Sequence, residues 1–391
     1  MLNTPFSPWP SFTQEEAEAV SRVLLSNKVN YWTGDVCRAF EREYAAYVGT
    51  PYAVAVANGT VALELALYAL GIGADDEVIT TSRTYIASAS CVVMRGALPV
   101  VVDVDRVSQN ISPEAIRAAI TSRTKAIIVV HLAGWSCDMD AIIAIAKEHD
   151  LKVIEDCAQA HGATYKGRQV GSFGHAAAFS FCQDKIISTG GEGGMMTTHD
   201  EGVWERAWAY KDIGRSYDAV YRREHPPGFR WLIDSFGTNW RMTEMQAVIG
   251  RLQLKKLDAW IAKRRENAAV LTQAFQTIPA LRVTLPPQHI GHAYYKYYAF
   301  VETNRLKADW SRDRVIAELS QRGVHCFSGS CSEIYLEKAF ETLPSKPKGR
   351  LPVAKELGET SLMFLVHPTL EFGYMQEVAA AVRDIFLQAS R

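Results

Sequence analysis

The sequence lacks the features that mark several classes of protein. Its seven cysteines are scattered, odd in number and free of any C-x-x-C pair. This spacing supports neither a disulfide framework nor a zinc or iron–sulfur site. No run of about 18 apolar residues occurs, and the first residues contain no basic and apolar leader. The sequence therefore predicts a protein of the reducing cytoplasm that neither spans nor binds a membrane.

Charge of one sign is not in excess either. The 42 basic and 43 acidic residues are interleaved and give a formal net charge of −1, which provides no basic surface for nucleic acid or anionic lipid. Hydrophobic residues at 48% and charged residues at 22% match ordinary globular usage and exclude a mostly disordered chain. A chain of 391 residues exceeds the size at which one core keeps growing, so we expect two domains.

Short apolar or β-branched runs alternate with helix-period segments in the first half of the chain. This alternation is typical of an α/β fold in which crossover helices connect the strands of a mainly parallel sheet. The near-continuous apolar character of the runs indicates a sheet covered on both faces. Seven strands are predicted, the last of them a candidate antiparallel strand, at residues 53–56, 77–81, 99–103, 125–131, 152–155, 177–181 and 194–198.

Beyond residue 244 the pattern becomes helical and then mixed. Apolar residues at three- and four-residue spacing predict one helix from Met245 to about Phe275, which would bridge two domains. The remaining strands and helices, near 281–285, 295–301, 313–323 and 376–387, would form a small α+β domain. We therefore expect an N-terminal segment and a large α/β domain over residues 1–250, and the bridging helix with the small domain over 251–391.

Lys185 lies in the turn between the predicted strand 177–181 and the glycine-rich run 190–194. A lysine that forms a Schiff base with pyridoxal phosphate needs a carboxylate on the pyridinium nitrogen and donors for the phosphate. Asp156, at the end of the strand 152–155, and Ser180, five residues before Lys185, are placed to supply them. Each residue alone is ordinary, because most Lys and Asp side chains are solvated, so the prediction of a cofactor site rests on the combination.

Three other candidates follow strand ends. The amides of Gly59 and Thr60, at a strand-to-helix junction, would face a phosphate, although Asn58 or Thr60 could simply cap the helix. Tyr85 could stack on a flat ring in the loop after the next strand, where an aromatic residue is more often part of the core. Gln159 could reach the phenolic oxygen of the cofactor. The absence of G-x-G-x-x-G disfavours the rival at the level of fold, a nicotinamide dehydrogenase.

Five spaced motifs occur in the order of one known family. They are N-G-T at Asn58, E-D-x-A-Q-A-H-G from Glu155, F-S-F-x-x-x-K through Lys185, G-G-E-G-G from Gly190 and N-W-R-M-T-E-M-Q-A from Asn239. The sequence thus resembles the DegT/DnrJ/EryC1/StrS family of sugar aminotransferases over most of its length. The resemblance implies a fold-type I enzyme that forms homodimers with active sites at the subunit boundary. It also implies amino transfer from glutamate or glutamine to a keto sugar, usually linked to a nucleotide.

Carried over position by position, the resemblance assigns roles to nine residues. Lys185 would carry pyridoxal phosphate and move protons, Asp156 would partner the pyridinium nitrogen, and Gln159 would contact the phenolic oxygen. The other contacts that the resemblance implies are Gly59, Thr60 and Ser180 for the phosphate, Tyr85 for ring stacking, Asn239 of the neighbouring subunit for the phosphate, and Arg241 for a substrate anion.

The sequence also departs from many members of the family. Cys182 stands where many relatives have histidine, and residues 327–332 lack a histidine that others carry, so the choice of substrate stays open. Lys185 argues against the dehydratases of the family, in which histidine replaces the lysine, and the scattered cysteines argue against its iron–sulfur members. Two alternatives remain: an aminotransferase for a cyclitol or aminobenzoate-type ketone, and a non-catalytic regulatory protein that keeps the fold.

Overall fold

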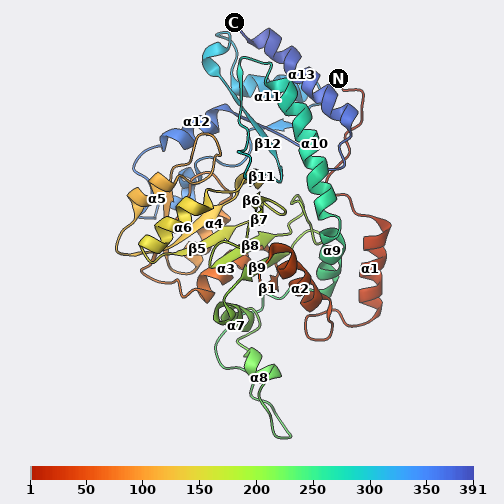
Figure 1. Ribbon diagram of the computed structural model, residues 1–391, viewed down its shortest axis with the longest axis vertical. Coiled ribbons are helices and arrows are strands. Elements are labelled where there is room, and N and C mark those ends of the chain that lie inside the picture. Colours follow the sequence, from red (N-terminus) through yellow and green to blue (C-terminus); the bar gives the residue numbers. More distant parts are fainter. Residues whose placement is uncertain (1) are drawn as a thin grey trace.

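The computed structural model describes residues 2–391, and a seven-stranded sheet forms its centre (Figure 1). The strand order is β1-β9-β8-β5-β4-β2-β3, and all neighbours are parallel except the two pairs that β9 makes. The prediction of a mainly parallel sheet with an antiparallel last strand is confirmed. The strands are β1 (Tyr52–Val56), β2 (Glu77–Thr81), β3 (Leu98–Val102), β4 (Thr124–Val130), β5 (Lys152–Asp156), β8 (Ala176–Ser180) and β9 (Gly194–Thr198).

Helices cover both faces of this sheet, as the apolar strands require. In β4, Ala126 and Ile128 belong to one hydrophobic core, whereas Ile127 and Val129 belong to another on the opposite face, because successive strand side chains alternate. The first core lies under α2 (Val36–Val48), α3 (Gly59–Ala69), α4 (Ala87–Met94) and α7 (Glu201–Tyr210), and the second under α5 (Pro113–Ala119) and α6 (Met139–Glu148).

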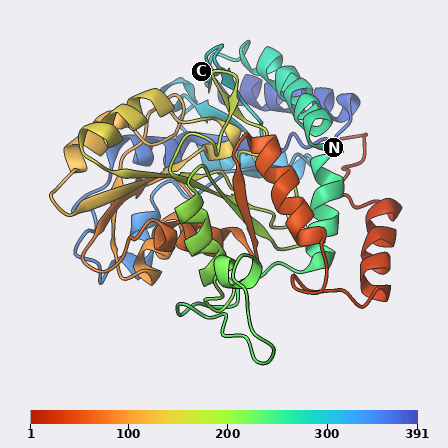
Figure 2. The same ribbon diagram turned by 60° about the horizontal axis from the view of Figure 1, so that its bottom comes forward.

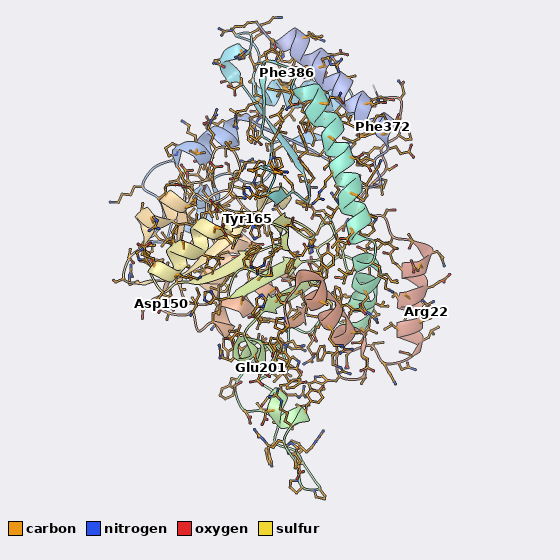
Figure 3. All side chains as sticks on the ribbon, viewed as in Figure 1. Arg22, Asp150, Tyr165, Glu201, Phe372 and Phe386 are labelled. Carbon is orange, nitrogen blue, oxygen red and sulfur yellow. The ribbon has the colours of Figure 1, made fainter. Side chains whose placement is uncertain are left out.

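The C-terminal part of the chain builds an antiparallel sheet with its own core. The strand order is β10-β12-β14-β13, and the strands are β10 (Leu281–Val283), β12 (Tyr297–Val301), β13 (Cys326–Phe327) and β14 (Ser361–Phe364). Helices α11 (Arg312–Gln321), α12 (Pro352–Thr360) and α13 (Phe372–Ala389) accompany it. Figure 3 marks the two ends of α13, where Phe386 is buried and Phe372 is exposed.

Short elements complete the chain. A three-stranded sheet joins the two parts, because β11 (Ile290–Gly291) pairs with β6 (Thr164–Tyr165), which also pairs with β7 (Arg168–Gln169). The remaining elements are α1 (Gln14–Leu25), α8 (Tyr217–Tyr221) and the 3₁₀ turns η1 (Leu132–Gly134), η2 (Thr303–Arg305), η3 (Ile334–Leu336) and η4 (Lys338–Phe340). No helix within residues 2–391 is both long and apolar enough to cross a membrane.

The single helix predicted from Met245 to Phe275 is two helices in the structure. They are α9 (Glu244–Leu254) and α10 (Leu257–Phe275), separated by Lys255 and Lys256. The Lys256 amide donates to the carbonyl of Gln253, three residues earlier, at 3.0 Å. Such a tighter turn closes a helix without changing the apolar spacing that the sequence displays, so periodicity alone does not reveal the break.

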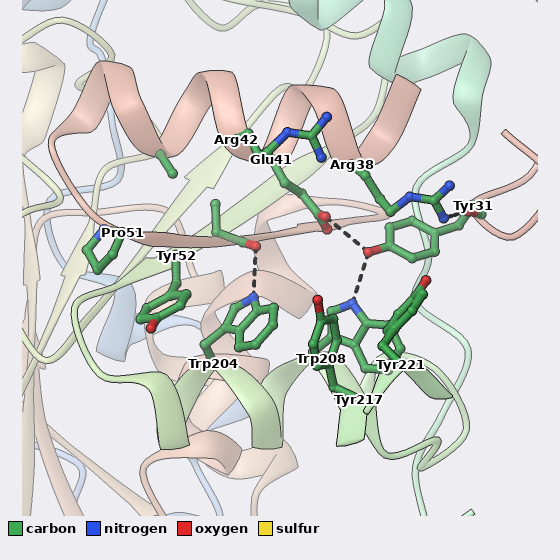
Figure 4. Close-up of a pocket in the computed structure, with 12 residues that line it drawn as sticks. Tyr31, Arg38, Glu41, Arg42, Pro51, Tyr52, Trp204, Trp208, Tyr217 and Tyr221 are labelled. Carbon is green, nitrogen blue, oxygen red and sulfur yellow. Dashed lines mark hydrogen bonds between the residues drawn. The ribbon is translucent and has the colours of Figure 1, made fainter. Parts of the chain in front are cut away.

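The β1 edge of the large sheet is covered mainly by side chains, and a backbone bridge between Val56 and Arg241 lies at its end. Along β1, the Ala55 amide donates to Glu41 at 2.9 Å, and Trp204 donates its indole N–H to the Ala53 carbonyl at 3.3 Å. Tyr31 donates to the other oxygen of Glu41 at 3.0 Å, beside a cavity of about 350 Å³ shown in Figure 4. An edge whose backbone groups are already paired does not recruit further strands.

One glycine offers a direct test of the packing between β8 and the preceding loop. Gly171 has φ +91°, and a Cβ there would lie 2.4 Å from Cζ of buried Phe179. Gly171→Ala should lower the free energy of unfolding by about 3 kcal/mol, since it adds left-handed strain and overpacking. Gly167→Ala is the control, because Gly167 has φ +79° but open space around it, and should cost only about 1 kcal/mol. Equal losses in urea unfolding would show that packing against Phe179 is unimportant.

Candidate active site

A cavity of about 920 Å³ lies at the carboxyl ends of the parallel strands, between the large sheet and the antiparallel sheet. Open α/β sheets bind ligands at this edge. Seven of the nine residues predicted for the site line this cavity, and Lys185 and Asp156 are among them; the full set is Gly59, Thr60, Tyr85, Asp156, Gln159, Ser180 and Lys185.

Lys185 is held in the cavity wall by its backbone. Its amide donates to the Cys182 carbonyl at 3.0 Å, and its own carbonyl accepts the indole N–H of Trp9 at 2.8 Å. The Lys185 side chain is largely buried, and its Nζ lies 4.0 Å from Oδ1 of Asp184. The amine therefore sits beside one carboxylate and has access to the cavity.

Two residues that precede β12 of the antiparallel sheet hold Asp184 in place. Its Oδ2 accepts the hydroxyl of Tyr295 and lies 3.8 Å from Nζ of Lys296. Burial opposes ionisation of Asp184, but Lys185, Tyr295 and Lys296 outweigh burial and hold the pKa of this carboxyl below its usual value. Asp184 is thus an anion shared by two lysines.

Asp156 is the last residue of β5 and is buried beneath the cavity. Its Oδ2 accepts the hydroxyl of Ser88 at 2.8 Å, and its Oδ1 accepts the Ala158 amide at 3.1 Å. Burial raises the pKa of Asp156 above the usual 3.8, although Ser88, Ala158 and the charge of Lys185 act in the opposite direction. A positively charged ring nitrogen would relieve this burial cost, since an opposite charge favours the ionised carboxylate.

The beginning of α3 approaches the end of β8 closely. A Cβ at Gly59 would lie 2.6 Å from Cβ of Ser180, so a side chain there cannot be accommodated without movement. Asn58 caps α3 through its side chain, which accepts the Val61 amide at 3.0 Å. Neither the Gly59 nor the Thr60 amide donates to any described residue. Asn58 is therefore the cap, and Gly59, Thr60 and Ser180 form a concave group of potential anion donors.

A buried histidine, His161, holds the backbone of Ser180 in place. Nε2 of His161 lies 2.8 Å from the Ser180 carbonyl, and Nδ1 lies 2.7 Å from the hydroxyl of Tyr44. Burial lowers the pKa of His161 to about 3, so the ring is neutral and donates from Nε2. His161 positions Ser180, and its ring nitrogens are fully used within the protein.

Gln159 and Tyr85 lie on the cavity wall in different settings. The side-chain carbonyl of Gln159 accepts the Ala133 amide at 2.9 Å, which fixes the side chain and leaves its amide nitrogen as a donor. Ala133 has a positive φ of 56°, so this bond also holds a strained turn. Tyr85 is 68% exposed, which leaves its ring free rather than packed in the core.

The structure does not bring Asn239 and Arg241 to this cavity. Asn239 is exposed and pairs through its backbone with Asp212. The Arg241 guanidinium is ion-paired with the buried carboxylate of Asp212, which also accepts Arg215 at 3.1 Å. Within one chain, neither side chain can touch a ligand held by Lys185.

Several residues that line or support the cavity had no sequence signal. Ser88 reaches Asp156 across 68 positions of chain, and Tyr295 reaches Asp184 across 111 positions. Residues from the C-terminal part complete the far wall, and they include Lys296, Tyr298, Ser330, Cys331, Glu337 and Met363. Asp184 could have been suspected from its place next to Lys185, and Ser330 and Cys331 belong to the segment 327–332 in which the sequence departs from many relatives.

A second cluster, of residue types that often bind metals, is held together by hydrogen bonds within the protein. Ligand atoms of His131, Glu155 and Cys157 lie within 4.8 Å of one another. His131 donates from Nε2 to Glu155 at 3.0 Å, and its Nδ1 accepts the Cys137 amide at 3.0 Å. Because the protein already uses both histidine nitrogens, this cluster has no free nitrogen for a metal.

The fold and the lysine–carboxylate cavity at its strand ends define a fold-type I transferase. The structure superimposes on an aminotransferase from Psychrobacter cryohalolentis with a TM-score of 0.96 and 59% identity, over 98% of this chain and 99% of that one. It also matches DesV from S. venezuelae in complex with a ketimine intermediate, with a TM-score of 0.85 and 34% identity over 95% and 94% of the chains. GDP-perosamine synthase from Escherichia coli O157:H7 is 40% identical over 377 residues, which are 96% of this chain and 97% of that protein.

The model of the DegT/DnrJ/EryC1/StrS aminotransferase family matches residues 10–383. The chain therefore belongs to this family, and the predicted family, fold class and aminotransferase assignment are confirmed. The nicotinamide dehydrogenase alternative is excluded by the same match.

The buried carboxylate should cost stability in the absence of a ligand. Because the pKa of Asp156 in the folded protein lies above 3.8, its ionised form is destabilising at neutral pH, and this cost disappears below the unfolded value. Asp156→Asn should therefore raise the free energy of unfolding of ligand-free protein at pH 7 by about 1 kcal/mol. The gain should vanish at pH 3.5 in urea titrations. A less stable variant at pH 7 would contradict this reading of Asp156.

Proposed function

We propose that the protein is a pyridoxal phosphate-dependent aminotransferase that moves an amino group from glutamate or glutamine to a nucleotide-linked keto sugar. The observation that carries this proposal is the meeting of Lys185, Asp156 and the Gly59–Ser180 group in one cavity. The name GDP-perosamine synthase specifies a nucleotide-linked product for one relative, and the ketimine complex of DesV supports the cofactor.

The donor set fits pyridoxal phosphate. The unpaired amides of Gly59 and Thr60 at the start of α3, with the hydroxyls of Thr60 and Ser180, suit a phosphate dianion. A Cβ at Gly59 would collide with Ser180, so glycine allows these two groups of donors to lie close together. When bound, the cofactor supplies an electron sink for loss of a proton next to the transferred nitrogen.

The remaining roles follow from the surroundings of each side chain. Lys185 would hold the cofactor through Nζ and, once released, move a proton, a contribution of about 10²- to 10⁴-fold to the rate. Asp156 would keep the pyridine nitrogen protonated, because its burial favours a cationic partner. Gln159 would donate to the phenolic oxygen, since its carbonyl is occupied by Ala133. Tyr85 would cover the ring with its exposed face.

The size and polarity of the far wall support a sugar nucleotide as acceptor. A volume of about 920 Å³ is at the upper end of small-molecule sites, which span about 300–1,000 Å³. The wall offers hydroxyl, carboxylate and ammonium groups from Ser330, Glu337 and Lys296, which are suited to sugar hydroxyls and a diphosphate. These groups line the same cavity as Lys185.

The decisive experiment supplies the purified protein with pyridoxal phosphate, glutamate or glutamine, and a panel of keto compounds. We expect amine incorporation into a nucleotide-linked 3-keto or 4-keto hexose, detected by mass spectrometry. Lys185→Ala should bind pyridoxamine phosphate and form no product, because the proton-transfer amine is gone. Turnover by Lys185→Ala would refute its assignment. Amination of cyclitol or aminobenzoate-type ketones alone would favour the first alternative, and no donor-dependent pyridoxamine formation would favour the regulatory one.

We further infer a homodimer with shared active sites. The loop after α8 projects from the body of the chain, as Figures 1 and 2 display, and carries three exposed aromatic side chains: Phe229 at 78%, Trp231 at 79% and Phe236 at 96%. Exposed apolar groups of this size mark interaction surfaces. Asn239 follows this loop and would reach the phosphate bound in a second copy. A cytoplasmic location agrees with seven unpaired cysteines.

Shared sites predict complementation between two inactive variants. Lys185→Ala and Asn239→Ala should each be strongly impaired as pure dimers. Random co-assembly after co-expression should restore about a quarter of the active sites, because half of the dimers are mixed and each mixed dimer contains one intact site. Activity assays on the mixed preparation measure this recovery, and the purified variants mixed without subunit exchange are the control. No recovery would contradict a contribution of Asn239 across the interface.

A further inference from the structure

Lys296, just before β12, is the second lysine in the wall of the active-site cavity. Within residues 2–391, no other lysine and no arginine or histidine lines this cavity besides Lys185. The carboxylate residues that line it are Asp156, Asp184, Glu192 and Glu337. Arg241, which the resemblance assigns to a substrate anion, is ion-paired with buried Asp212 outside the cavity. Once Lys185 carries the cofactor, Lys296 is therefore the cation that this chain offers to an anionic substrate group.

The ammonium group of Lys296 is partly enclosed but still available to a ligand. Its side chain is 18% exposed, and its one ion pair in the described part of the chain is with Asp184, whose Oδ2 lies 3.8 Å from Nζ. This distance is longer than a hydrogen bond. Nζ also keeps accessible surface, unlike the enclosed unpaired nitrogens of Arg264. Because an ammonium group has three donors, Nζ can bind a ligand oxygen while Asp184 stays beside it.

Lys296 and Lys185 lie beside the same two groups. Their Nζ atoms are 3.8 and 4.0 Å from the two oxygens of Asp184, and 4.6 and 5.1 Å from the ring centroid of Tyr295. In amino transfer the donor nitrogen takes the place of Nζ of Lys185 on the cofactor. The α-carboxylate of an amino acid is two bonds from that nitrogen, whereas the diphosphate of a 3-keto or 4-keto hexose lies across the sugar ring from the reacting carbon. The α-carboxylate is therefore the substrate anion that comes nearest to Lys296.

The surroundings of Lys296 favour binding of an anion. Burial, followed by the charges of Arg264 and Lys185, lowers the pKa of Lys296 to about 8, against the opposite effect of Asp184. The group is thus an ammonium ion at neutral pH. A carboxylate bound beside it would stabilise the charged form, because an opposite charge offsets the cost of burial.

We propose that Lys296 binds the α-carboxylate of the amino-acid donor. Its ammonium group would donate to this carboxylate, while Asp184 holds the lysine from the other side. Glutamate and glutamine both carry an α-carboxylate, so Lys296 would select amino acids over simple amines without choosing between these two donors. The inference rests on the proposed aminotransferase function, because it assigns a substrate group to the same cavity.

Stable conjugates of the cofactor test this binding without turnover. Pyridoxal phosphate joined to glutamate and reduced to a secondary amine is titrated calorimetrically into full-length protein freed of cofactor. The conjugate of γ-aminobutyrate, which lacks only the α-carboxylate, is titrated in the same way. The wild-type protein should bind the glutamate conjugate at least about tenfold more tightly, the gain expected from a charge-assisted hydrogen bond. Lys296→Met should bind the two conjugates equally and should bind pyridoxamine phosphate as the wild type does.

The donor half of the reaction gives a second measurement. In Lys296→Met loaded with pyridoxal phosphate, the glutamate concentration for half-maximal formation of pyridoxamine phosphate should rise at least about tenfold. Lys296→Arg should recover much of the loss, because it keeps the positive charge and the donors. Should Lys296→Met fail to fold, Lys296→Gln replaces it with the same expected loss.

Arg265→Gln is the matched control for both measurements. Arg265 donates to the His292 carbonyl at 2.9 Å and lines a different groove, so its variant should keep the preference of the wild type. An equal loss in Arg265→Gln, a preference retained in Lys296→Met, or no preference in the wild type would overturn the role of Lys296. A wild-type protein that does not bind pyridoxamine phosphate would instead refute the proposed function, and this inference with it.

Discussion

Two carboxylates stand next to each other at the end of β5. Glu155 holds part of the backbone framework, and Asp156 lines the candidate active site. Successive strand residues face opposite sides of the sheet, so Glu155 and Asp156 meet different surroundings. Glu155 accepts the amides of Gly171, Phe173 and Gly174 at 2.7–2.8 Å, besides His131. Burial opposes its ionisation, but these donors hold its pKa below the usual value. Asp156 has two donors, and burial raises its pKa, so it is the carboxylate left in need of a cation.

The cavity above Asp156 depends on segments that lie outside the large sheet. Trp9 from the N-terminal segment holds the carbonyl of Lys185, and Tyr295, just before β12, holds Asp184 beside it. The position of Lys185 is therefore set by contacts from the N-terminal segment and from the antiparallel sheet. The same arrangement places the ammonium groups of Lys185 and Lys296 at 4.0 and 3.8 Å from Asp184.

Much of the large sheet could be predicted because strand and helix periods are local properties. The boundaries of the seven predicted strands match the observed ones to within one residue, and β2 and β9 coincide with their predicted ranges. Short elements escaped prediction, including β13, β14 and α12, because two to nine residues carry little periodic signal. The break between α9 and α10 escaped for another reason, since Lys255 and Lys256 preserve the helical spacing of apolar residues.

The sequence by itself determined the family and the identity of the groups that meet in the cavity: Lys185, Asp156, Ser180 and the Asn58–Thr60 turn. Only the tertiary structure decided which charges are neutralised. Arg241 is paired with Asp212, whereas two nitrogens of Arg264 have no acceptor within residues 2–391. Residue type and periodicity are local properties that can be read from the sequence. Desolvation and Coulomb forces act through space between residues that are far apart in sequence, so they depend on the tertiary structure.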